Sequence, residues 1–177
     1  MGTPRDPALV KPICGLLLAD PSLLEQVQPA LQSIFGKLDC RSEVRPWHWS
    51  TYYAREMGEQ LWRCWLSFAT LAPPDELVHW KLATNELEHQ LAREGRRVVN
   101  ADPGYIAALK LVLASTKDAP HRIYLAKGIY AEVTLVFERG NFVPLPYTYR
   151  DYAEETTRNF FAGVRSRYLV QQRLPRP

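Results

Sequence analysis

The sequence predicts an α+β protein built on a ferredoxin-like α/β plait, in which two helices cover one face of an antiparallel sheet. Two observations support this prediction. The first hundred residues read in the order β-α-β-β-α-β, which is the order of that plait. The chain has 177 residues, 46% of them hydrophobic, as expected for one globular domain. We therefore expect a single domain over residues 1–170 and a flexible basic tail over residues 171–177.

The first strand and helix are predicted from one apolar run and from the residues that start and end the helix after it. KPICGLLLAD, residues 11–20, predicts a buried strand. Asp20 can cap the next helix, and Pro21 suits its first position. Apolar residues then repeat at helical spacing as far as Ile34, and Gly36 is placed to end the helix.

Two strands and a second helix come next. LDCRSEVRPWHW (38–49) and QLWRCWLSFATL (60–71) alternate as strands do, and the segment between them is too long for a tight turn. Residues 73–76 open a helix whose apolar face extends to Leu91. The segment RRVVN (96–100) is then a short strand.

Further elements extend this core. Asp102-Pro103 predicts the start of a helix that runs through about Ala114, because Asp is a good N-cap and Pro suits the first helical position. HRIYLAKGIYAEVTL (121–135) predicts a hairpin with a two-residue turn at Lys127-Gly128. A second turn follows at residues 138–141, and the chain ends in a helix around residues 151–168.

Polar residues on the predicted hairpin indicate a functional face. In the register that the turn sets, Ile123 faces Glu132 and His121 faces Thr134, with Arg122 on the opposite face. An imidazole, a carboxylate and a hydroxyl on one face suit proton transfer or cation binding. We therefore predict His121 and Glu132 as catalytic residues. The alternative is a solvated face on which Glu132 pairs with a nearby cation.

The residues around the predicted helix 102–114 extend this site. Asn100 and Asp102 stand at its start, and Lys117 follows its end, next to the hairpin. Asp102 either caps the helix or joins Glu132 in holding a divalent cation. The predicted ligand-binding residues are Asn100, Lys117, Arg122, Lys127 and Thr134, and the predicted metal ligands are Asp102 and Glu132.

The chain resembles a known family. The stretches KLATNELEHQLAREGRRVVNADPGYIAALKLVLASTKD, HRIYLAKGIYAEVTL and PLPYTYRDY are similar to the bacterial and archaeal family called domain of unknown function 4416. The resemblance covers nearly the whole chain, with Ala126, Tyr147 and Arg150 where the family usually has Gly, Trp and Pro. It implies little chemistry, although family members are sometimes labelled GTP-binding by automatic transfer.

The residues allow that label to be tested. No G-x-x-x-x-G-K-[ST] loop occurs in the sequence, so the phosphate cradle of a P-loop GTPase is absent. Thr116-Lys117-Asp118 resembles a guanine-reading motif but lacks its intervening residue. These observations exclude a GTPase of the usual kind and leave nucleotide binding by another route open.

Two functions agree with the sequence, and a structural subunit with neither site is the third alternative. The first is binding of a small anionic ligand, a nucleotide or phosphoester, with or without a divalent cation. The second is a non-catalytic module that binds RNA or protein through the aromatic residues around Trp47 and a strip of arginines. Those arginines are Arg158, Arg165, Arg167 and Arg173. The net charge of +3 is too small to imply nucleic acid by itself.

Other classes find no support. No apolar stretch approaches the roughly 20 residues of a membrane-spanning helix, and the N-terminal residues do not resemble a signal peptide. The three cysteines lack disulfide-framework or zinc spacing, and Cys14 and Cys64 fit as buried hydrophobes. The E-x-x-H pair of Glu86 and His89 fits a solvated helix face. We expect a cytoplasmic protein without a membrane partner.

Overall fold

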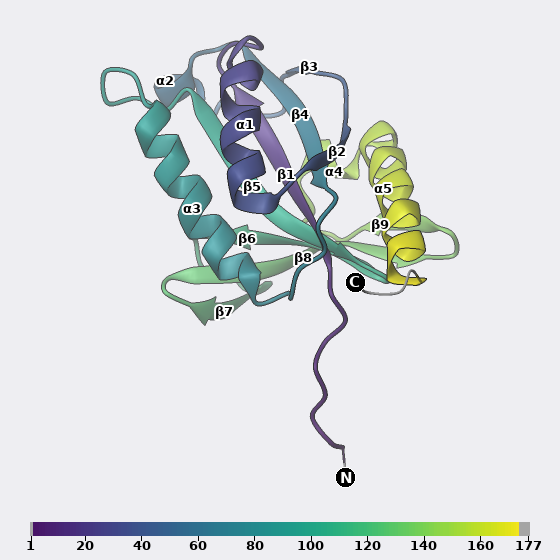
Figure 1. Cartoon of the computed structure of the whole chain (residues 1–177). Coiled ribbons are helices and arrows are strands. Elements are labelled where there is room, and N and C mark those ends of the chain that lie inside the picture. The colour runs from purple at the N-terminus through teal and green to yellow at the C-terminus, as the bar shows by residue number, and fades with distance from the viewer. Residues whose placement is uncertain (1, 174–177) are drawn as a thin grey trace.

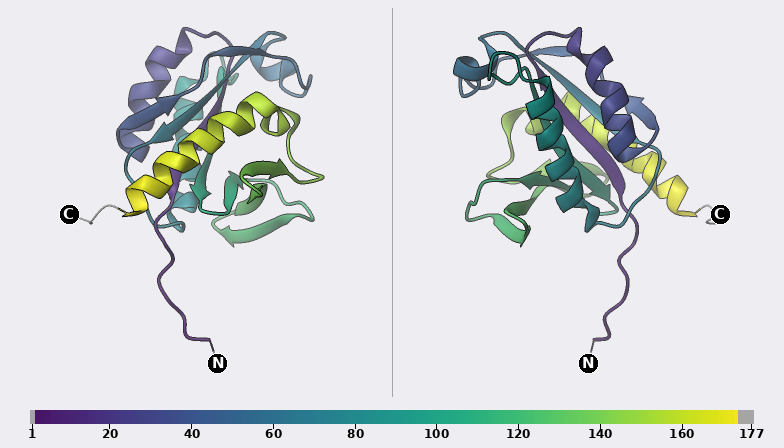
Figure 2. Two further views of the ribbon diagram at one scale, coloured as in Figure 1. Left: turned by 90° about the vertical axis from the view of Figure 1, so that its right-hand side faces the viewer. Right: turned by 60° about the vertical axis from the view of Figure 1, so that its left-hand side comes forward.

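Every residue of the strand β1 (Lys11–Leu18) is buried. A strand that is buried on both faces needs a layer of structure on each side of its sheet. The computed structural model, which describes residues 2–173, contains both layers. The helices α1 (Leu23–Phe35) and α3 (Glu76–Leu91) cover one face, and α5 (Glu155–Arg173) covers the other (Figure 1, Figure 2).

The remaining elements connect these layers. The other strands are β2 (Leu38–Arg41), β3 (Arg45–Trp47), β4 (Leu61–Phe68), β5 (Val99–Ala107), β6 (Lys110–Ser115), β7 (Arg122–Ala126), β8 (Ile129–Glu138) and β9 (Asn141–Pro144). The short helices α2 (Ala54–Met57) and α4 (Arg150–Ala153) lie in the connections.

Neighbouring strands of the sheet are antiparallel. Their order is β2-β4-β1-β5-β6-β8-β7, with β3 paired to β4 and β9 paired to β8. The protein therefore combines helices with a large antiparallel sheet, which confirms the predicted α+β class. Within that sheet, β5, β1, β4 and β2 lie in this order.

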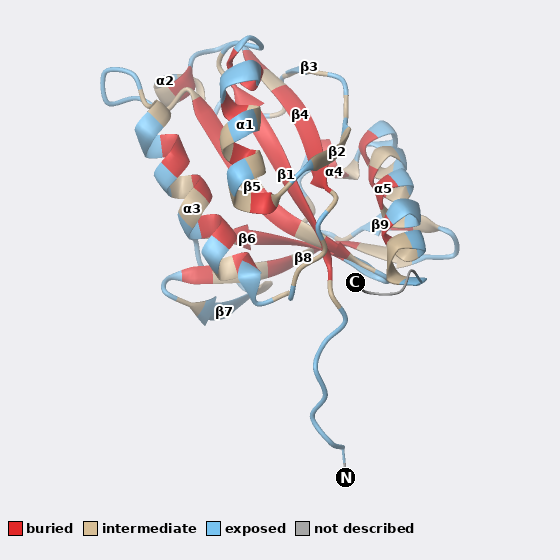
Figure 3. Ribbon diagram, in the orientation of Figure 1, coloured by how far each residue is buried: buried red, intermediate tan, exposed pale blue. Residues whose placement is uncertain are grey.

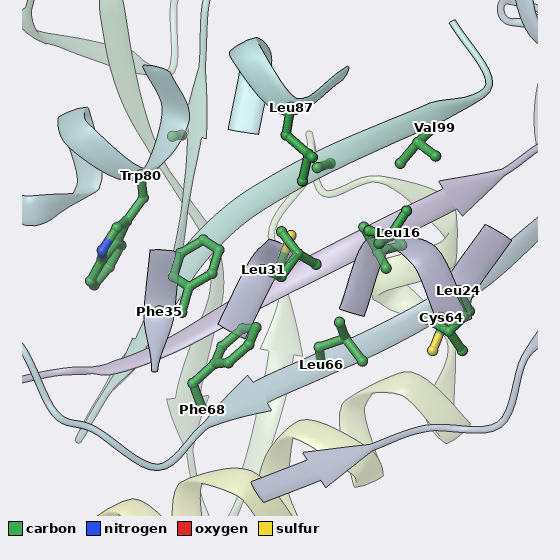
Figure 4. Close-up of a cluster of buried hydrophobic side chains, with 14 of the residues drawn as sticks. Leu16, Leu24, Leu31, Phe35, Cys64, Leu66, Phe68, Trp80, Leu87 and Val99 are labelled. Atoms are coloured by element: carbon green, nitrogen blue, oxygen red, sulfur yellow. The ribbon is translucent and has the colours of Figure 1, made fainter. Parts of the chain in front are cut away.

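The face that α1 and α3 cover holds the larger apolar core. In Figure 4, Leu31 and Phe35 of α1 lie between Trp80 of α3 and the strand residues Leu16 and Phe68. The rings of Phe35 and Phe68 stack with their centroids 4.7 Å apart. Each fully buried side chain of this size stabilises the fold by about 1.5–3 kcal/mol. The helical spacing of apolar residues in α1 thus places these side chains on the one face of the helix that contacts the sheet.

The opposite face of the sheet packs against α4 and α5. Trp65 of β4 contacts Tyr152 and Phe161, with ring centroids 4.3 and 5.4 Å away. Gly15 makes room for this cluster, because a Cβ atom there would lie 2.6 Å from the Trp65 ring. Burial on both faces is visible in Figure 3, where the central strands are largely red.

The predicted helix over residues 102–114 is wrong. These residues belong to β5 and β6, which form an antiparallel hairpin. β5 pairs with β1 along its length, from Val99 opposite Leu18 to Ile106 opposite Lys11. This long-range pairing outweighs the local capping signal of Asp102-Pro103.

The hairpin of β7 and β8 has the predicted turn but a different register. Lys127 and Gly128 both have positive φ, 52° and 76°, as a two-residue turn requires. A bulge between Tyr124 and Ala126 shifts the pairing, so that Arg122 lies opposite Glu132. Arg122 therefore shares a face with Glu132, and the predicted pairing of Ile123 with Glu132 is wrong.

Residues outside the strands correct two further predictions. His121 precedes β7, so it does not lie opposite Thr134 in the ladder. α5 continues to Arg173, where a flexible tail was expected from residue 171 onward. Gln171 donates to the Ala69 carbonyl at 2.8 Å, which anchors this end of the helix. The rest of the expected tail, residues 174–177, lies outside the described residues.

Candidate functional site

A cavity forms where β5 and β6 separate. The two strands pair only from Gly104 and Leu113 toward their turn, so the first half of β5 pairs with β1 alone. Helix α3 supplies partners for the backbone of this free segment. Lys81 Nζ donates to the Ala101 carbonyl at 2.9 Å, and the Ala101 N–H donates to Glu88 Oε1 at 2.8 Å.

The cavity has a volume of about 670 Å³. This lies within the roughly 300–1,000 Å³ of typical small-molecule sites. Its wall combines charged, amide and aromatic side chains from α3, the β3–β4 connection and the strands β4 to β8. The polar and aromatic lining residues are Trp47, Ser50, Tyr52, Tyr53, Glu56, Arg63, Lys81, Asn85, Glu88, His89, Arg97, Asn100, Asp102, Ser115, Thr116, Lys117, Arg122, Glu132, Tyr149 and Asp151.

Glu132 is the centre of a hydrogen-bond network on the hairpin. Its side chain is only 2% exposed. Its Oε2 accepts from Arg122 Nε at 3.0 Å and lies 3.1 Å from His121 Nε2. Its Oε1 accepts from the Thr134 hydroxyl at 3.2 Å. Three side chains therefore hold this carboxylate in one orientation at the cavity wall, and Tyr147 stacks on the His121 ring with centroids 4.1 Å apart.

Arg97 joins α2, α3 and β5 at the cavity wall. It donates to both carboxylate oxygens of Glu56 at 2.6 Å, to Glu88 Oε2 at 3.0 Å and to Asn100 Oδ1 at 3.0 Å. The hydrogen bonds from Arg97 hold the pKa of Glu56 below its ordinary value. Burial raises the pKa of Glu88, although the positive charge of Lys81 opposes this effect. This clamp fixes α2 and its loop against the cavity.

Asp102 and Asp151 are both paired with Arg63 of β4. Arg63 Nη1 donates to Asp102 Oδ2 at 3.2 Å. Its Nε lies 3.0 Å from Asp151 Oδ2, close enough for an ion pair but without hydrogen-bond alignment. Asn100 Nδ2 also donates to Asp102, at 3.0 Å, and Trp47 Nε1 donates to Asp151 at 3.0 Å.

The cavity wall carries balanced formal charge. Five cations (Arg63, Lys81, Arg97, Lys117, Arg122) and five acids (Glu56, Glu88, Asp102, Glu132, Asp151) line it, so +5 and −5 cancel. The local charge at each point of the cavity therefore depends on how these groups are paired. The three arginines pair with acids. Within residues 2–173, Lys81 and Lys117 have no carboxylate at ion-pair distance.

Lys117 stands at the cavity rim with a neutral partner. Its Nζ donates to the Tyr52 hydroxyl at 2.5 Å and lies 4.4 Å from the centroid of the same ring. This hydrogen bond lowers the pKa of Tyr52. Because a phenol does not cancel the ammonium charge, Lys117 keeps its positive charge available to a ligand.

A comparison with known families identifies the chain. The family described as Domain of unknown function (DUF4416) matches residues 8–168. The chain belongs to this family. Searches of curated proteins and of solved structures found no match for this DUF4416 protein. In residues 2–173, no helix has both the length and the apolar character needed to cross a bilayer.

The predicted site residues fall into three groups in the DUF4416 fold. Asn100, Asp102, Lys117, Arg122 and Glu132 line the cavity. His121 and Thr134 contact Glu132 but do not line the cavity themselves. Lys127 lies exposed in the turn between β7 and β8. The first two groups thus form one continuous site, and Lys127 stands apart from it.

The predicted metal ligands have other partners. Within residues 2–173, no group of three His, Cys, Asp or Glu side chains gathers as a metal centre would require. Asp102 accepts from Arg63 and Asn100, and Glu132 accepts from Arg122. In this DUF4416 protein, arginines therefore already pair with both predicted metal ligands.

Sequence reasoning missed the contribution of α3. Lys81, Asn85, Glu88 and His89 stand at positions i, i+4, i+7 and i+8, and all four line the cavity. Such spacing places side chains on one helix face. A polar stripe beside the apolar positions of the same helix was the signal that would have found them. Glu86 is exposed, as expected, whereas the exposed His89 also borders the cavity.

The predicted arginine strip is partly used by the chain itself. Arg158 donates to the carbonyls of Ala153 and Phe142 at 3.0 Å. Arg165 donates to the Ala108 carbonyl at 2.7 Å. Two of the four predicted arginines therefore tie α5 to neighbouring segments of this DUF4416 protein.

Proposed function

We propose that this DUF4416 protein binds a small anionic ligand, a nucleotide or phosphoester, in the cavity between α3, β5 and β6. The observation that carries this proposal is that polar side chains from separate elements line the same cavity. Asn100 and Glu132 come from separate elements and line one cavity with Lys81 and Lys117, which have no carboxylate at ion-pair distance among residues 2–173. A cation without an acidic partner attracts an anionic ligand without first giving up an ion pair.

The aromatic residues at the cavity support a ligand with a planar ring. Tyr52 and Tyr53 lie edge to face, with centroids 5.0 Å apart, and Trp47 packs beside Tyr53 at 5.9 Å. Stacking of a base on such a ring contributes about 1–3 kcal/mol. A nucleotide would place its base against these rings and its phosphate toward a lysine.

The His121–Glu132 pair supports a chemical role for the same site. A carboxylate at hydrogen-bond distance from an imidazole fixes the orientation of the ring. Arg122 shares the same carboxylate oxygen, and Thr134 holds the other. We therefore propose proton transfer through His121 and Glu132 as the reaction step that a bound substrate would use.

A ligand screen tests the proposal. The melting temperature of the wild-type protein is measured against nucleotides, phosphorylated metabolites and divalent cations. A ligand at 100 times its Kd adds about 2.7 kcal/mol of stability. We expect the shift to shrink in Lys117→Met and to persist in Lys127→Met, since both lysines are exposed but only Lys117 lines the cavity.

Two outcomes would contradict the proposal. The first is the absence of any shift with nucleotides and phosphoesters, and the second is an equal shift in both lysine variants. Salt-sensitive binding of RNA by a protein that ignores small ligands would favour the RNA or protein interaction module instead.

We also infer the finer fold and the location. The order β5-β1-β4-β2, with α1 and α3 on one face, supports a ferredoxin-like plait in the first hundred residues. The cysteines at positions 14, 40 and 64 are free, which supports a reducing compartment such as the cytoplasm.

A further inference from the structure

We infer that Lys81 is the internal anchor of the cavity and binds a terminal oxyanion of the ligand, a phosphate or a carboxylate. This inference rests on the proposed function and deepens it, because it states which group of the bound ligand contacts the buried lysine. The position was not among the predicted site residues.

The first support is the burial of Lys81 without a carboxylate at ion-pair distance among residues 2–173. Its side chain lies on the buried face of α3, where the residue is only 6% exposed, yet it lines the cavity. Within residues 2–173, Ala101 O is the only hydrogen-bond partner of its Nζ. An ammonium has three N–H donors, so two remain for a ligand. Burial of a charge with so few hydrogen-bond partners costs stability unless another group, such as a ligand, occupies the remaining donors.

A second buried lysine, Lys11, uses all of its hydrogen-bond donors within the chain. Lys11 is 0% exposed, and its Nζ donates to Asp39 Oδ2, the Phe68 carbonyl and Gln171 Oε1. All three of its donors are used within the chain. The same residue type at similar burial is therefore saturated in one region and open in the cavity.

Glu88 attracts the charge of Lys81 at longer range but does not occupy its hydrogen-bond donors. Glu88 is the acid of α3 that shares Ala101 with it, but no ion pair joins the two side chains. Glu88 is instead bound by Arg97 and by the Ala101 N–H. Two open donors on a positively charged nitrogen suit an oxyanion with at least two oxygens, as phosphate and carboxylate both have.

Anion titrations test the inference. Inorganic phosphate and acetate are added separately at constant ionic strength, with chloride as the reference salt, and the melting temperature is followed. The proteins are wild type, Lys81→Met, Lys117→Met and Lys127→Met. Loss of a hydrogen bond to a charged group weakens binding by roughly 10- to 100-fold. We expect that loss for Lys81→Met and unchanged affinity for Lys127→Met.

The outcomes separate this inference from the function it rests on. If Lys81→Met binds the anions as wild type does while Lys117→Met does not, the inference is overturned and the anionic ligand stands. If wild type responds to no anion or nucleotide, both are overturned. A response to phosphate alone supports a phosphoester at Lys81, and one to acetate alone supports a carboxylate there.

A second variant guards against misfolding. Lys81→Gln keeps a donor for the Ala101 carbonyl but removes the charge. We expect it to fold, as circular dichroism would show, and to lose anion binding as Lys81→Met does. Retention of wild-type affinity in folded Lys81→Gln would overturn the ionic anchor.

Discussion

Two buried lysines in the same fold have opposite surroundings. Lys11 joins β1 to Asp39 of β2, to the Phe68 carbonyl at the end of β4 and to Gln171 of α5. Among the residues that the structure describes, Lys81 has one acceptor, a backbone carbonyl, and it lines the cavity. The comparison teaches that burial alone does not assign a role to a charged residue. The number of its donors that the chain itself satisfies separates a structural lysine from one available to a ligand.

The Lys11 region is built to hold a charge. Asp39 accepts from Lys11 through one oxygen and from the Ser67 hydroxyl through the other, at 2.7 Å. Removal of the Lys11 ammonium would leave the Asp39 carboxylate and the Phe68 carbonyl without their cation.

The largest expected effect is therefore on stability at Lys11. Lys11→Met should lower the free energy of unfolding by about 3–5 kcal/mol, as for other broken buried ion pairs. Lys81→Met should cost less than about 1 kcal/mol, because the lost hydrogen bond is offset by removal of a poorly compensated charge. Urea denaturation of both variants measures the difference. Equal losses would contradict the distinction between the two lysines.

The sequence predicted the elements whose periodicity agrees with their burial. Residues 11–18, 23–35 and 76–91 form the strand and helices that their apolar spacing indicated. Asp102-Pro103 failed as a helix start because the pairing of β5 with β1 is a long-range contact that local capping rules do not contain. Gly104 reflects the pairing of β5 with its other neighbour β6, since a Cβ atom there would lie 2.3 Å from the Val112 carbonyl oxygen.

The site was predictable to the extent that polar residues interrupted an apolar strand. Glu132 was found for that reason, although the predicted register placed Arg122 on the opposite face and the observed register brings Arg122 to the Glu132 carboxylate. Lys81 was missed because hydropathy places it in solvent and its neighbour Leu82 in the core. The structure reverses this order, with Leu82 37% exposed and Lys81 6% exposed. Burial of a charge depends on tertiary partners that no local pattern contains.

The hairpin network should behave like the Lys11 region and not like Lys81. Glu132→Gln keeps the shape of the side chain but removes the charge that Arg122 and His121 contact. We expect a loss of about 1.5–3 kcal/mol in the free energy of unfolding, the contribution of hydrogen bonds to a charged group. Glu138→Gln, an exposed change on the same strand, is the control and should lie within about 0.5 kcal/mol of wild type. A loss no larger than that control would show that the carboxylate charge contributes little to the network.

Glu88 should give the cavity wall a pH dependence of its own. Burial raises its pKa above the ordinary 4.5, so the folded state favours the protonated form. Its stabilising contribution is complete below pH 4.5 and is lost as the pH rises through the folded pKa. The stability of wild type relative to Glu88→Gln should therefore fall over that interval, by at most about 1.4 kcal/mol per pH unit.

Urea unfolding at several pH values checks this slope, with Glu86→Gln as the exposed control on the same helix. In Lys81→Met the opposing attraction is gone, so the interval should extend to higher pH. A stability difference between wild type and Glu88→Gln that stays constant with pH would contradict the raised pKa.

The smallest expected effect concerns the rim lysine and leaves stability unchanged. The hydrogen bond from Lys117 lowers the pKa of the Tyr52 phenol, so Lys117→Met should return that pKa toward its ordinary value of 10.0. NMR of ring-labelled tyrosine follows the titration, with Lys127→Met as the control. An anion that binds Lys117 in the wild-type protein would compete for its donors and raise the Tyr52 pKa in the same direction. A Tyr52 titration that responds to neither the substitution nor the anion would remove Lys117 from the ligand site and leave Lys81 as its cation.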